Sequence, residues 1–428
     1  MTDYDEILSF LINRLPMYQR KGASAYKNDL SVTLALDDYF NHPHMSYQNI
    51  HVAGTNGKGS VSHFLASVLQ QAGYRVGLYT SPHYRDFRER IKINGEMIAE
   101  QEVMDFVNTH YDNIAELTPS FFEMTFAMAM EHFRRSNVDV VIWETGMGGR
   151  LHSTNIVQPD VSVITNIALD HTQFLGNTIE EIAREKAGII KDHIPVVIGE
   201  KQADAVAVFQ SFAEKHKTQL YFASESISLN SLEISTKGLS VYYKDEQLGE
   251  GKLVLPLVAD YQVYNLKTAL QVFRILKELG YSITWSTIYE GLKNLFLNTG
   301  FKGRFQVLAD NPLTLADSGH NEGAVSRVME QIIKLDVAKK HFVIGMVNDK
   351  DISQVLKLMP KDAIYYFAKA DIPRGLPAEN LKAVAAEVGL TGQAYSSVQE
   401  AFNAAKQIAT KDDLIFIGGS TFTVAEVV

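Results

Sequence analysis

The sequence predicts an α/β protein of two domains, and three observations predict it. A glycine-rich segment, HVAGTNGKGSV (51–61), lies between an apolar run and a stretch of helical periodicity. Apolar runs of strand length then alternate with helical patterns, which is typical of parallel sheets covered by helices. The alternation breaks at LNTGFKGRF (297–305), then resumes for roughly 130 residues, a usual domain size. We therefore expect one domain at 1–297 and a smaller one at 298–428.

Composition is that of a soluble globular protein. The 428 residues exceed one ordinary core, and 46% hydrophobic with 21% charged residues is a usual balance for a globular protein. No apolar run reaches the length of a membrane span, and the acidic start does not resemble a signal peptide. Cysteine is absent, which excludes disulfides and thiolate chemistry. The net charge of −10, without a long basic block, argues against nucleic-acid binding. We expect a cytoplasmic enzyme.

The elements of the first domain follow the apolar pattern. Strands are expected at 49–54, 75–81, 139–144, 161–167 and 194–200, with helices at 61–73 and 121–135. Segments of alternating character within 224–256 predict a small antiparallel sheet, and a helix is expected at 264–280.

The second domain repeats the alternation. Its expected strands are 313–318, 341–347, 363–369 and 414–420, and its expected helices are 323–334, 351–359 and 379–389.

The glycine-rich segment predicts a phosphate-binding loop. Glycines let backbone N–H groups face phosphate oxygens, and the following helix adds its positive N-terminus, while Lys58 meets the β/γ-phosphate charge. The usual P-loop places Ser or Thr directly after the lysine to bind Mg²⁺, but here Gly59 follows Lys58. The predicted nucleotide-binding residues of the loop are Gly54, Thr55, Asn56, Gly57, Lys58, Gly59 and Ser60.

Polar side chains lie at the ends of the neighbouring strands. Glu144 ends one buried strand, Ser81 in TSPH ends the strand after the loop helix, and His171 in LDH follows another. Each alone has an ordinary structural alternative, a cap or a satisfied polar group. The carboxyl ends of parallel strands meet at one edge, so we expect these three groups to surround a single phosphate-bound metal.

The second domain offers Arg304 in GRF, and Asp317 and His320 in DSGHNEGA. From the residues alone, a surface arginine and a helix-capping aspartate explain this set as well as a functional site does.

Many ordered motifs give the chain a family resemblance. It resembles the folylpolyglutamate synthase/dihydrofolate synthase family, a branch of the Mur ligase superfamily. The motifs occur in that family's order and approximate spacing: GTNGKGSV, LYTSPH, DFRERIKINGE, SFFEMT, ETGMGGR, STNIV, NIALDHT, EKAGIIK, GRF, NDKD and GGSTF. The resemblance implies an N-terminal ATP-binding P-loop domain of Mur ligase type and a smaller C-terminal Rossmann-like domain without a dinucleotide.

The resemblance also implies a reaction and its cofactors. ATP phosphorylates a pteroate or folate carboxylate, and the amine of L-glutamate attacks the acyl phosphate, which yields amide, ADP and phosphate. Ser81 and Glu144 would hold a first Mg²⁺, and Glu144 and His171 a second. Lys186 in REKAGI matches the family's carbamylated lysine; without the resemblance it would be an exposed helix lysine. The catalytic set implied is Lys58, Glu144, His171 and Lys186.

Further positions carry over from the family. Asn265 and Arg304 match ATP-contacting residues, and Asp317 and His320 match the pair that the C-terminal domain places at the nucleotide. Phe122 matches a pterin-ring contact.

Three positions depart from the family pattern. His152 replaces an Asp near the folate pocket, Tyr261 replaces a His before Gln262, and DSGHNE (317–322) replaces DGAHNP. Because an imidazole would replace a carboxylate, we expect acceptor binding at His152 to change and activity to vary between about pH 5 and 8.

The function predicted is therefore an ATP- and Mg²⁺-dependent ligase of folate biosynthesis and one-carbon metabolism. Its acceptor is dihydropteroate, folyl-(poly)glutamate or both, and we expect a monomer without nucleic-acid or membrane partners. One alternative is a Mur-type ligase for UDP-muramyl substrates, against which SFFEMT (120–125) and RLPMYQRKGASAYK (14–27) argue. The other is a non-ligating P-loop NTPase, which would have no need of Arg304, Asp317 and His320.

Overall fold

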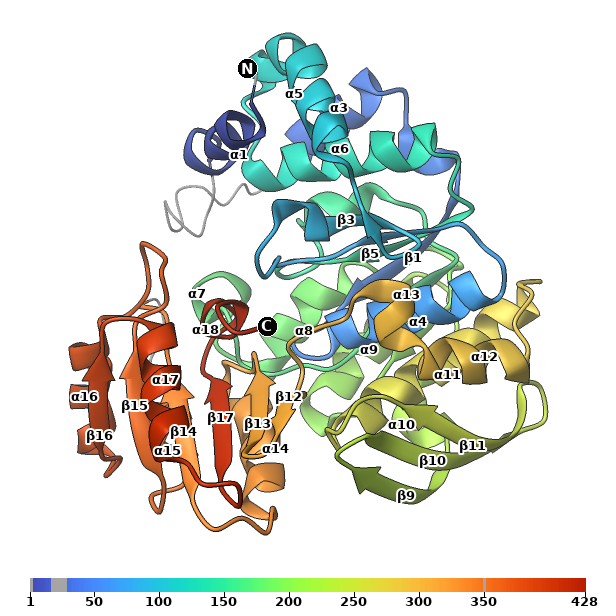
Figure 1. Ribbon diagram of the computed structural model, residues 1–428. Coiled ribbons are helices and arrows are strands. Elements are labelled where there is room, and N and C mark those ends of the chain that lie inside the picture. Colours follow the sequence, from blue (N-terminus) through green and yellow to red (C-terminus); the bar gives the residue numbers. More distant parts are fainter. Residues whose placement is uncertain (1–2, 17–28, 349–351) are drawn as a thin grey trace. The chain divides into compact units, whose positions relative to one another are not determined.

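The computed structural model describes residues 3–16, 29–348 and 352–428. Residues 17–27 of the RLPMYQRKGASAYK segment, and residues 349–351 of NDKD, lie outside the described residues. The chain forms two compact units. Unit 1 comprises residues 1–231, 241–253 and 263–300, and unit 2 comprises residues 232–240, 254–262 and 301–428. The predicted α/β class is confirmed in both (Figure 1).

Unit 1 is built on an eight-stranded sheet of order β4-β3-β2-β5-β1-β6-β7-β8. From β2 to β8 the neighbouring strands run parallel, and β3 and β4 extend the sheet antiparallel. The strands are β1 (Gln48–Ala53), β2 (Val76–Tyr79), β3 (Ile91–Ile93), β4 (Glu96–Met97), β5 (Val140–Glu144), β6 (Val161–Ile164), β7 (Val196–Ile198) and β8 (Leu220–Phe222). Strands β1, β5 and β6 are almost wholly buried, as their apolar sequences predict.

Helices cover this sheet. Helix α4 (Lys58–Gln71) follows β1 and packs against β1, β2 and β5. The first turn of α4 contains the loop lysine, so the N–H groups of that turn have no acceptor within the helix. The other helices of unit 1 are α1 (Tyr4–Asn13), α3 (Ser31–Tyr39), α5 (Glu100–Ile114), α6 (Phe121–Arg135), α7 (Thr172–Leu175), α8 (Ile179–Ala187), α9 (Ala203–Lys215), α10 (Ala223–Ser226), α11 (Gln262–Glu278), α12 (Trp285–Lys293) and α13 (Leu295–Thr299); 3₁₀ turns are η2 (Pro43–Met45), η3 (Phe87–Arg90), η4 (Ala115–Leu117) and η5 (Ser153–Ile156).

An aromatic and aliphatic core joins α1, α3, α5 and α6 to β2 and β5. Trp143 on β5 lies at its centre, with the rings of Tyr79, Phe126 and Phe133 within 5.6 Å between centroids. Figure 1 shows these helices gathered at the top of the view, next to the strands of unit 1. Helix α6 begins with a capping box, in which Ser120 and Glu123 satisfy each other's backbone N–H groups.

The small antiparallel sheet predicted within 224–256 is confirmed. It consists of β9 (Leu229–Ser235), β10 (Gly238–Asp245) and β11 (Gly249–Leu255) in the order β11-β10-β9.

Unit 2 contains a six-stranded sheet of order β12-β13-β17-β14-β15-β16. All pairs are parallel except the antiparallel edge strand β12. Its strands are β12 (Gln306–Asp310), β13 (Leu313–Asp317), β14 (Lys340–Ile344), β15 (Ile364–Ala368), β16 (Gly392–Tyr395) and β17 (Leu414–Gly418), and its helices are α14 (Glu322–Ile333), α15 (Ser353–Lys357), α16 (Ala378–Glu387), α17 (Val398–Ile408) and α18 (Thr421–Ala425). Its core cluster includes Val258 and Ala259 from the segment that precedes α11.

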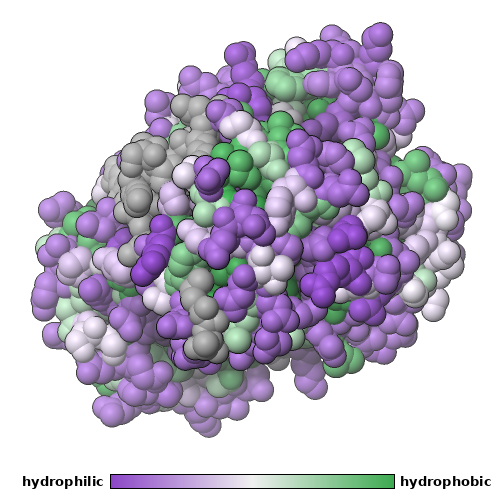
Figure 2. Space-filling view, turned by 90° about the horizontal axis from the view of Figure 1, so that it is seen from above, coloured by the Kyte–Doolittle hydropathy of each residue, from purple (hydrophilic) through white to green (hydrophobic). Residues whose placement is uncertain are grey.

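The face drawn in Figure 2 is largely hydrophilic, with apolar residues in small groups. Among the described residues, no helix combines the length and the apolar character that crossing a bilayer requires.

Candidate active site

Two glycines of the loop occupy positions that no other residue fits. Gly54 has φ of +144°, and a Cβ there would lie 1.9 Å from Thr165 Oγ1. Gly57 has φ of +86°, and a Cβ there would lie 2.2 Å from Asn265 Oδ1. Both backbones need the freedom of glycine and the close approach it allows. The second contact brings Asn265, from α11, directly against the loop, and its expected contact with ATP stays a prediction.

The loop is braced by the end of β6. The N–H of Thr55 donates to Asn166 O at 2.9 Å, and the N–H of Asn56 donates to Asn166 Oδ1 at 2.8 Å. Thr165 Oγ1 donates to Asn56 O at 2.5 Å, and Asn166 Nδ2 donates to Glu200 Oε1 at 3.0 Å. Sequence reasoning missed Thr165 and Asn166 as supports of the loop. Their position directly after a buried strand was the available signal.

Lys58 and Lys186 share one carbonyl. Lys58 Nζ donates to Gly54 O and Thr55 O, each at 3.0 Å, and Lys186 Nζ donates to Gly54 O at 2.8 Å. Lys186 is only 4% exposed, on α8. Burial, with the charge of Lys58 second, lowers the pKa of Lys186 to about 7. The structure therefore places Lys186 inside, next to the loop, and the exposed-lysine alternative is wrong.

Glu144 and Ser81 meet beside the loop. The N–H of Ser81 donates to Glu144 Oε2 at 3.1 Å. A Cβ on Gly59 would lie 3.6 Å from Glu144 Oε1, so this carboxylate faces the residue that follows the loop lysine. A Cβ on Gly146 would lie 3.3 Å from Ser81 Oγ, which places the serine hydroxyl at the turn after β5. Two hard oxygen donors thus lie where the loop lacks its own hydroxyl.

His171 lies at the start of α7 in a left-handed conformation, with φ of +51°. Its backbone N–H donates to Asp170 Oδ1 at 2.9 Å, and its Nε2 lies 4.0 Å from the same oxygen. In the described parts of the chain, His, Asp and Glu side chains do not gather into a group of three that could hold a metal ion by themselves. A metal bound by Glu144 and Ser81 would thus need ligands from elsewhere, which phosphate oxygens can provide.

His152 belongs to a hydrogen-bonded chain. The N–H of Gly146 donates to His152 Nε2 at 2.9 Å, and the N–H of Thr154 donates to His152 Nδ1 at 3.3 Å. Nδ1 also lies 2.8 Å from Thr154 Oγ1. The same hydroxyl lies 2.8 Å from Nε2 of the buried His51. Burial, with the charge of Lys58 second, lowers the pKa of His152 to about 4. This shift favours the neutral imidazole, and the pH dependence of activity expected at His152 stays a prediction.

Phe122 lies at the start of α6 beside a buried arginine. The guanidinium of Arg90 lies 5.1 Å from the ring centroid of Phe121 and 5.8 Å from that of Phe122. Arg90 Nε donates to His83 Nδ1 at 2.7 Å. Burial, followed by the charge of Arg90, lowers the pKa of His83 to about 3, so His83 stays a neutral acceptor. Arg90 was missed by sequence reasoning, although it lies in the quoted DFRERIKINGE segment.

In unit 2, the Asp317 carboxylate lies at the end of β13 and is 3% exposed. It accepts from the N–H groups of Phe305 and Gly319, each at 2.7 Å, and from Tyr261 Oη at 2.6 Å. Arg304 hydrogen-bonds the hydroxyl of Ser318, and His320 Nδ1 lies 3.0 Å from Ser318 O. The three predicted residues of unit 2 are therefore grouped around one turn, and the helix cap of α14 is Asn321 rather than Asp317. The capping alternative is therefore wrong for Asp317, and Arg304 is partly buried and hydrogen-bonded to Ser318.

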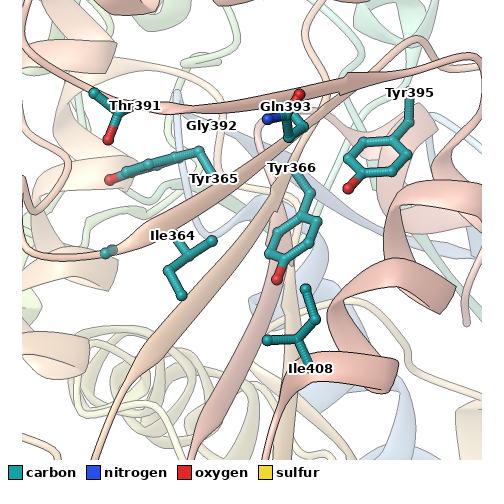
Figure 3. A pocket seen from close by; sticks show the side chains of 9 residues that line it. Ile364, Tyr365, Tyr366, Thr391, Gly392, Gln393, Tyr395 and Ile408 are labelled. Atoms are coloured by element: carbon teal, nitrogen blue, oxygen red, sulfur yellow. The ribbon is translucent and has the colours of Figure 1, made fainter.

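A hollow of about 390 Å³ occurs elsewhere in unit 2. It lies along β15 and β16 and is lined in part by Tyr366, Gln393 and Tyr395 (Figure 3). The Tyr366 and Tyr395 rings stack with centroids 5.8 Å apart. None of the predicted site residues lines this hollow.

A glycine-rich loop of this build in one α/β unit, followed by a second α/β unit, is the architecture of a Mur-type ligase. Residues 52–273 match the Mur ligase middle domain, and residues 303–421 match the Mur ligase glutamate ligase domain. More particularly, the chain belongs to the folylpolyglutamate synthase/dihydrofolate synthase family. The family resemblance read from the motifs is confirmed.

Relatives and solved structures support this assignment. The dihydrofolate synthase/folylpolyglutamate synthase of Bacillus subtilis is 32% identical over 89% of this chain and 88% of its own. The structure of E. coli FolC in complex with DHPP and ADP has a TM-score of 0.85 at 30% identity, covering 100% of this chain and 97% of that one. A bifunctional folylpolyglutamate synthase/dihydrofolate synthase with Mn, AMPPNP and L-glutamate bound has a TM-score of 0.82 at 31% identity, covering 100% and 97%.

The chain spans about half the length of two further relatives. One is the probable bifunctional folylpolyglutamate synthase/dihydropteroate synthase of Halobacterium salinarum, which is 31% identical over 99% of this chain and 51% of its own.

Proposed function

We propose that this chain is an ATP-dependent ligase that adds L-glutamate to dihydropteroate and/or folyl-(poly)glutamate. The reaction passes through an acyl phosphate and releases ADP and phosphate. One observation carries the proposal most directly: Glu144 and Ser81 meet at the position where the loop lacks a metal-binding hydroxyl. Relatives that bind ADP with DHPP, and AMPPNP with Mn and L-glutamate, support the same reading.

The loop residues neutralise charge. A carboxylate is a poor electrophile until an oxygen is phosphorylated, and two anions must approach each other for that transfer. Lys58 and the N–H groups of the first turn of α4 supply positive charge for the phosphates. Asn265, packed against Gly57, is proposed to contact ATP from α11.

The residues present fit Mg²⁺, because Glu144 and Ser81 are hard oxygen donors adjacent to the phosphate loop. We propose Ser81 and Glu144 for a first ion, and Glu144 with His171 for a second. When bound, Mg²⁺ would lower the charge of the transferred phosphoryl group and of the acyl oxygens. Glu144 is 4% exposed, so it holds its position at the site without competition from bulk water.

Lys186 is proposed to be carbamylated. Carbamylation requires the neutral amine, and a pKa lowered to about 7 makes much of that amine neutral at physiological pH. A carbamate would carry negative charge toward the metal, whereas an ammonium would repel it. Lys186→Ala should lose most activity, Lys186→Arg should do no better, and formate or acetate should partly restore the alanine variant. An arginine variant with a normal rate, together with a high-resolution electron-density map that shows an unmodified lysine pointing to solvent, would contradict the carbamate.

Unit 2 and the acceptor side complete the proposal. Arg304, Asp317 and His320 are assigned to the nucleotide, since they cluster on one turn. Phe122 is assigned to the pterin ring, and His152 to support of the acceptor pocket through the backbone of Gly146. The domain limits 1–297 and 298–428, a monomeric state and a cytoplasmic location stay predictions of the same scheme.

The test is phosphate release from ATP with each pteroyl acceptor, with and without L-glutamate, and mass spectrometry of the product. We expect sustained turnover only when Mg²⁺, an acceptor and glutamate are all present, with one glutamate added per ATP consumed. ATP turnover that ignores both compounds and yields no amide would show a non-ligating NTPase instead.

A further inference from the structure

Tyr261 lies where the chain leaves unit 2. Residues 254–262 belong to unit 2, and the chain enters unit 1 at residue 263. The Tyr261 ring packs against the unit 2 core, which contains Phe305 and Leu315. Its hydroxyl donates to Asp317 Oδ2 at 2.6 Å, a short bond to a charged acceptor. The side chain is thus held at both its apolar and its polar end.

The Asp317 carboxylate joins two turns. Oδ1 accepts from the N–H of Gly319, in the turn after β13, and Oδ2 accepts from the N–H of Phe305, in the turn before β12. Of the three donors that the described residues give this carboxylate, only that of Tyr261 is a side chain. It is therefore the one that a substitution can remove without altering the backbone.

The two turns carry the proposed nucleotide residues. Arg304 precedes Phe305, and its guanidinium hydrogen-bonds the Ser318 hydroxyl, which itself donates to Gly303 O at 2.9 Å. The N–H of Ser318 also donates to Gly303 O, at 3.1 Å. His320 follows in the same turn, with Nδ1 3.0 Å from Ser318 O. A rotation of the Asp317 carboxylate would consequently displace both Arg304 and His320.

We propose that Tyr261 is a positioning residue for the nucleotide site of unit 2. Its phenol fixes the rotation of the Asp317 carboxylate, and the carboxylate sets the spacing of the turns that carry Arg304 and His320. The inference rests on the proposed function, because it assigns those residues to ATP. Tyr261 stands where the resembled family carries a His, and both side chains can donate one hydrogen bond to a carboxylate.

Tyr261→Phe removes only the hydroxyl. We expect the KM for ATP to rise about tenfold, the loss of one hydrogen bond to a charged group, with the KM for the pteroyl acceptor unchanged. Tyr261→His should restore most of the ATP affinity, because an imidazole N–H replaces the donor. The matched control is Tyr281→Phe in unit 1, which removes an identical 2.6 Å bond, from Tyr281 Oη to Asp160 Oδ2. That variant should lower the melting temperature and leave the KM for ATP unchanged.

The variants Asp317→Asn and Arg304→Ala test the assignment of unit 2 to the nucleotide separately from the role of Tyr261. If both leave the KM for ATP unchanged, the nucleotide assignment of unit 2 fails, and the role of Tyr261 fails with it. If both raise the KM while Tyr261→Phe does not, only the role of Tyr261 is overturned. Equal effects of Tyr261→Phe and Tyr281→Phe on the melting temperature, with no change in the KM for ATP, would also overturn it.

Discussion

Because the residue after the loop lysine is Gly59, which has no hydroxyl, another part of the chain must supply this metal ligand. The position after the lysine does face the Glu144 carboxylate, since a Cβ there would lie 3.6 Å from Oε1, an ordinary contact distance. The usual P-loop places its hydroxyl at this position. This chain places glycine there and brings Ser81 to Glu144 from the end of β2. A hydroxyl at position 59 and the hydroxyl of Ser81 are therefore alternative ways to place an oxygen ligand beside Glu144.

That equivalence predicts a rescue. Ser81→Ala should raise the Mg²⁺ concentration for half-maximal activity about tenfold, because one oxygen ligand is lost. Adding Gly59→Ser should recover part of the loss, since its hydroxyl is attached to a Cβ that already faces Glu144. The measurement is a Mg²⁺ titration of ATP turnover for wild type, the single variants and the double variant. Gly59→Ala in the Ser81→Ala background is the control, and a rescue by alanine as large as that by serine would refute the ligand explanation.

Several candidate site residues could be named from the sequence because polar residues at strand ends and lysines in glycine-rich turns have few structural roles. Lys58, Ser81 and Glu144 could be named from the sequence for that reason. The state of His152 could not, because its neutral charge depends on burial and on the Gly146 N–H, which only the folded chain brings together. The same holds for Thr165 and Asn166, whose partners lie more than a hundred residues away in sequence.

At the scale of elements, the turn before β1 is held by one buried carboxylate. Asp37, 4% exposed at the end of α3, accepts from His42 Nδ1 at 2.7 Å and His44 Nδ1 at 2.9 Å. The bond to Asp37 raises the pKa of His42. Burial opposes ionisation of Asp37, but the hydrogen bonds from His44 and His42 outweigh it and lower the pKa of Asp37. These bonds fix η2, which leads directly into the strand that carries the loop.

The sign of the His42 shift predicts a pH-dependent loss of stability. A group whose folded pKa is raised stabilises fully below its unfolded pKa, about 6.5, and loses that effect as pH rises through the folded value. His42→Asn keeps a residue that tolerates the left-handed conformation of position 42, where φ is +52°. The variant should therefore be destabilised more at pH 5.5 than at pH 8.5 in urea unfolding. His216→Asn, which removes a bond to the exposed Asp192, is the control, and a His42→Asn effect independent of pH would contradict the mechanism.

Element prediction succeeded where burial is continuous. Strands β1, β5, β6, β14, β15 and β17 are apolar runs covered on both faces, so their sequences alone indicate them. Strands β8, β12 and β16 lie at sheet edges, are only partly buried and carry mixed sequences, so no periodicity marks them. The helix expected at 351–359 is shorter, Ser353–Lys357, because Pro360 disfavours helical backbone in the residue before it.

At the scale of the whole molecule, unit 2 is not a continuous stretch of sequence. The segment 254–262 belongs to it, although it precedes α11 to α13 of unit 1. Gln331 on α14 holds this segment: its Nε2 donates to Val258 O at 2.5 Å, and its Oε1 accepts from the N–H of Asp260 at 2.9 Å. Local sequence patterns could not reveal this, because the contacts join residues about seventy positions apart. The break at 297–305 marks where the chain re-enters unit 2.

A fragment cut at the predicted boundary tests that arrangement. Residues 298–428 alone lack Val258 and Ala259, whose burial belongs to the unit 2 core, and lack the Tyr261 donor to Asp317. A synthetic peptide of residues 253–263 should bind the fragment and raise its melting temperature by about 5 °C at saturation, since a ligand of the folded state stabilises it by mass action. Circular dichroism melts at increasing peptide concentration measure this. Gln331→Ala in the fragment removes both backbone contacts and should abolish most of the shift. A fragment whose melting temperature ignores the peptide, while the Gln331→Ala fragment behaves identically, would mean that the 254–262 segment adds nothing to the stability of unit 2.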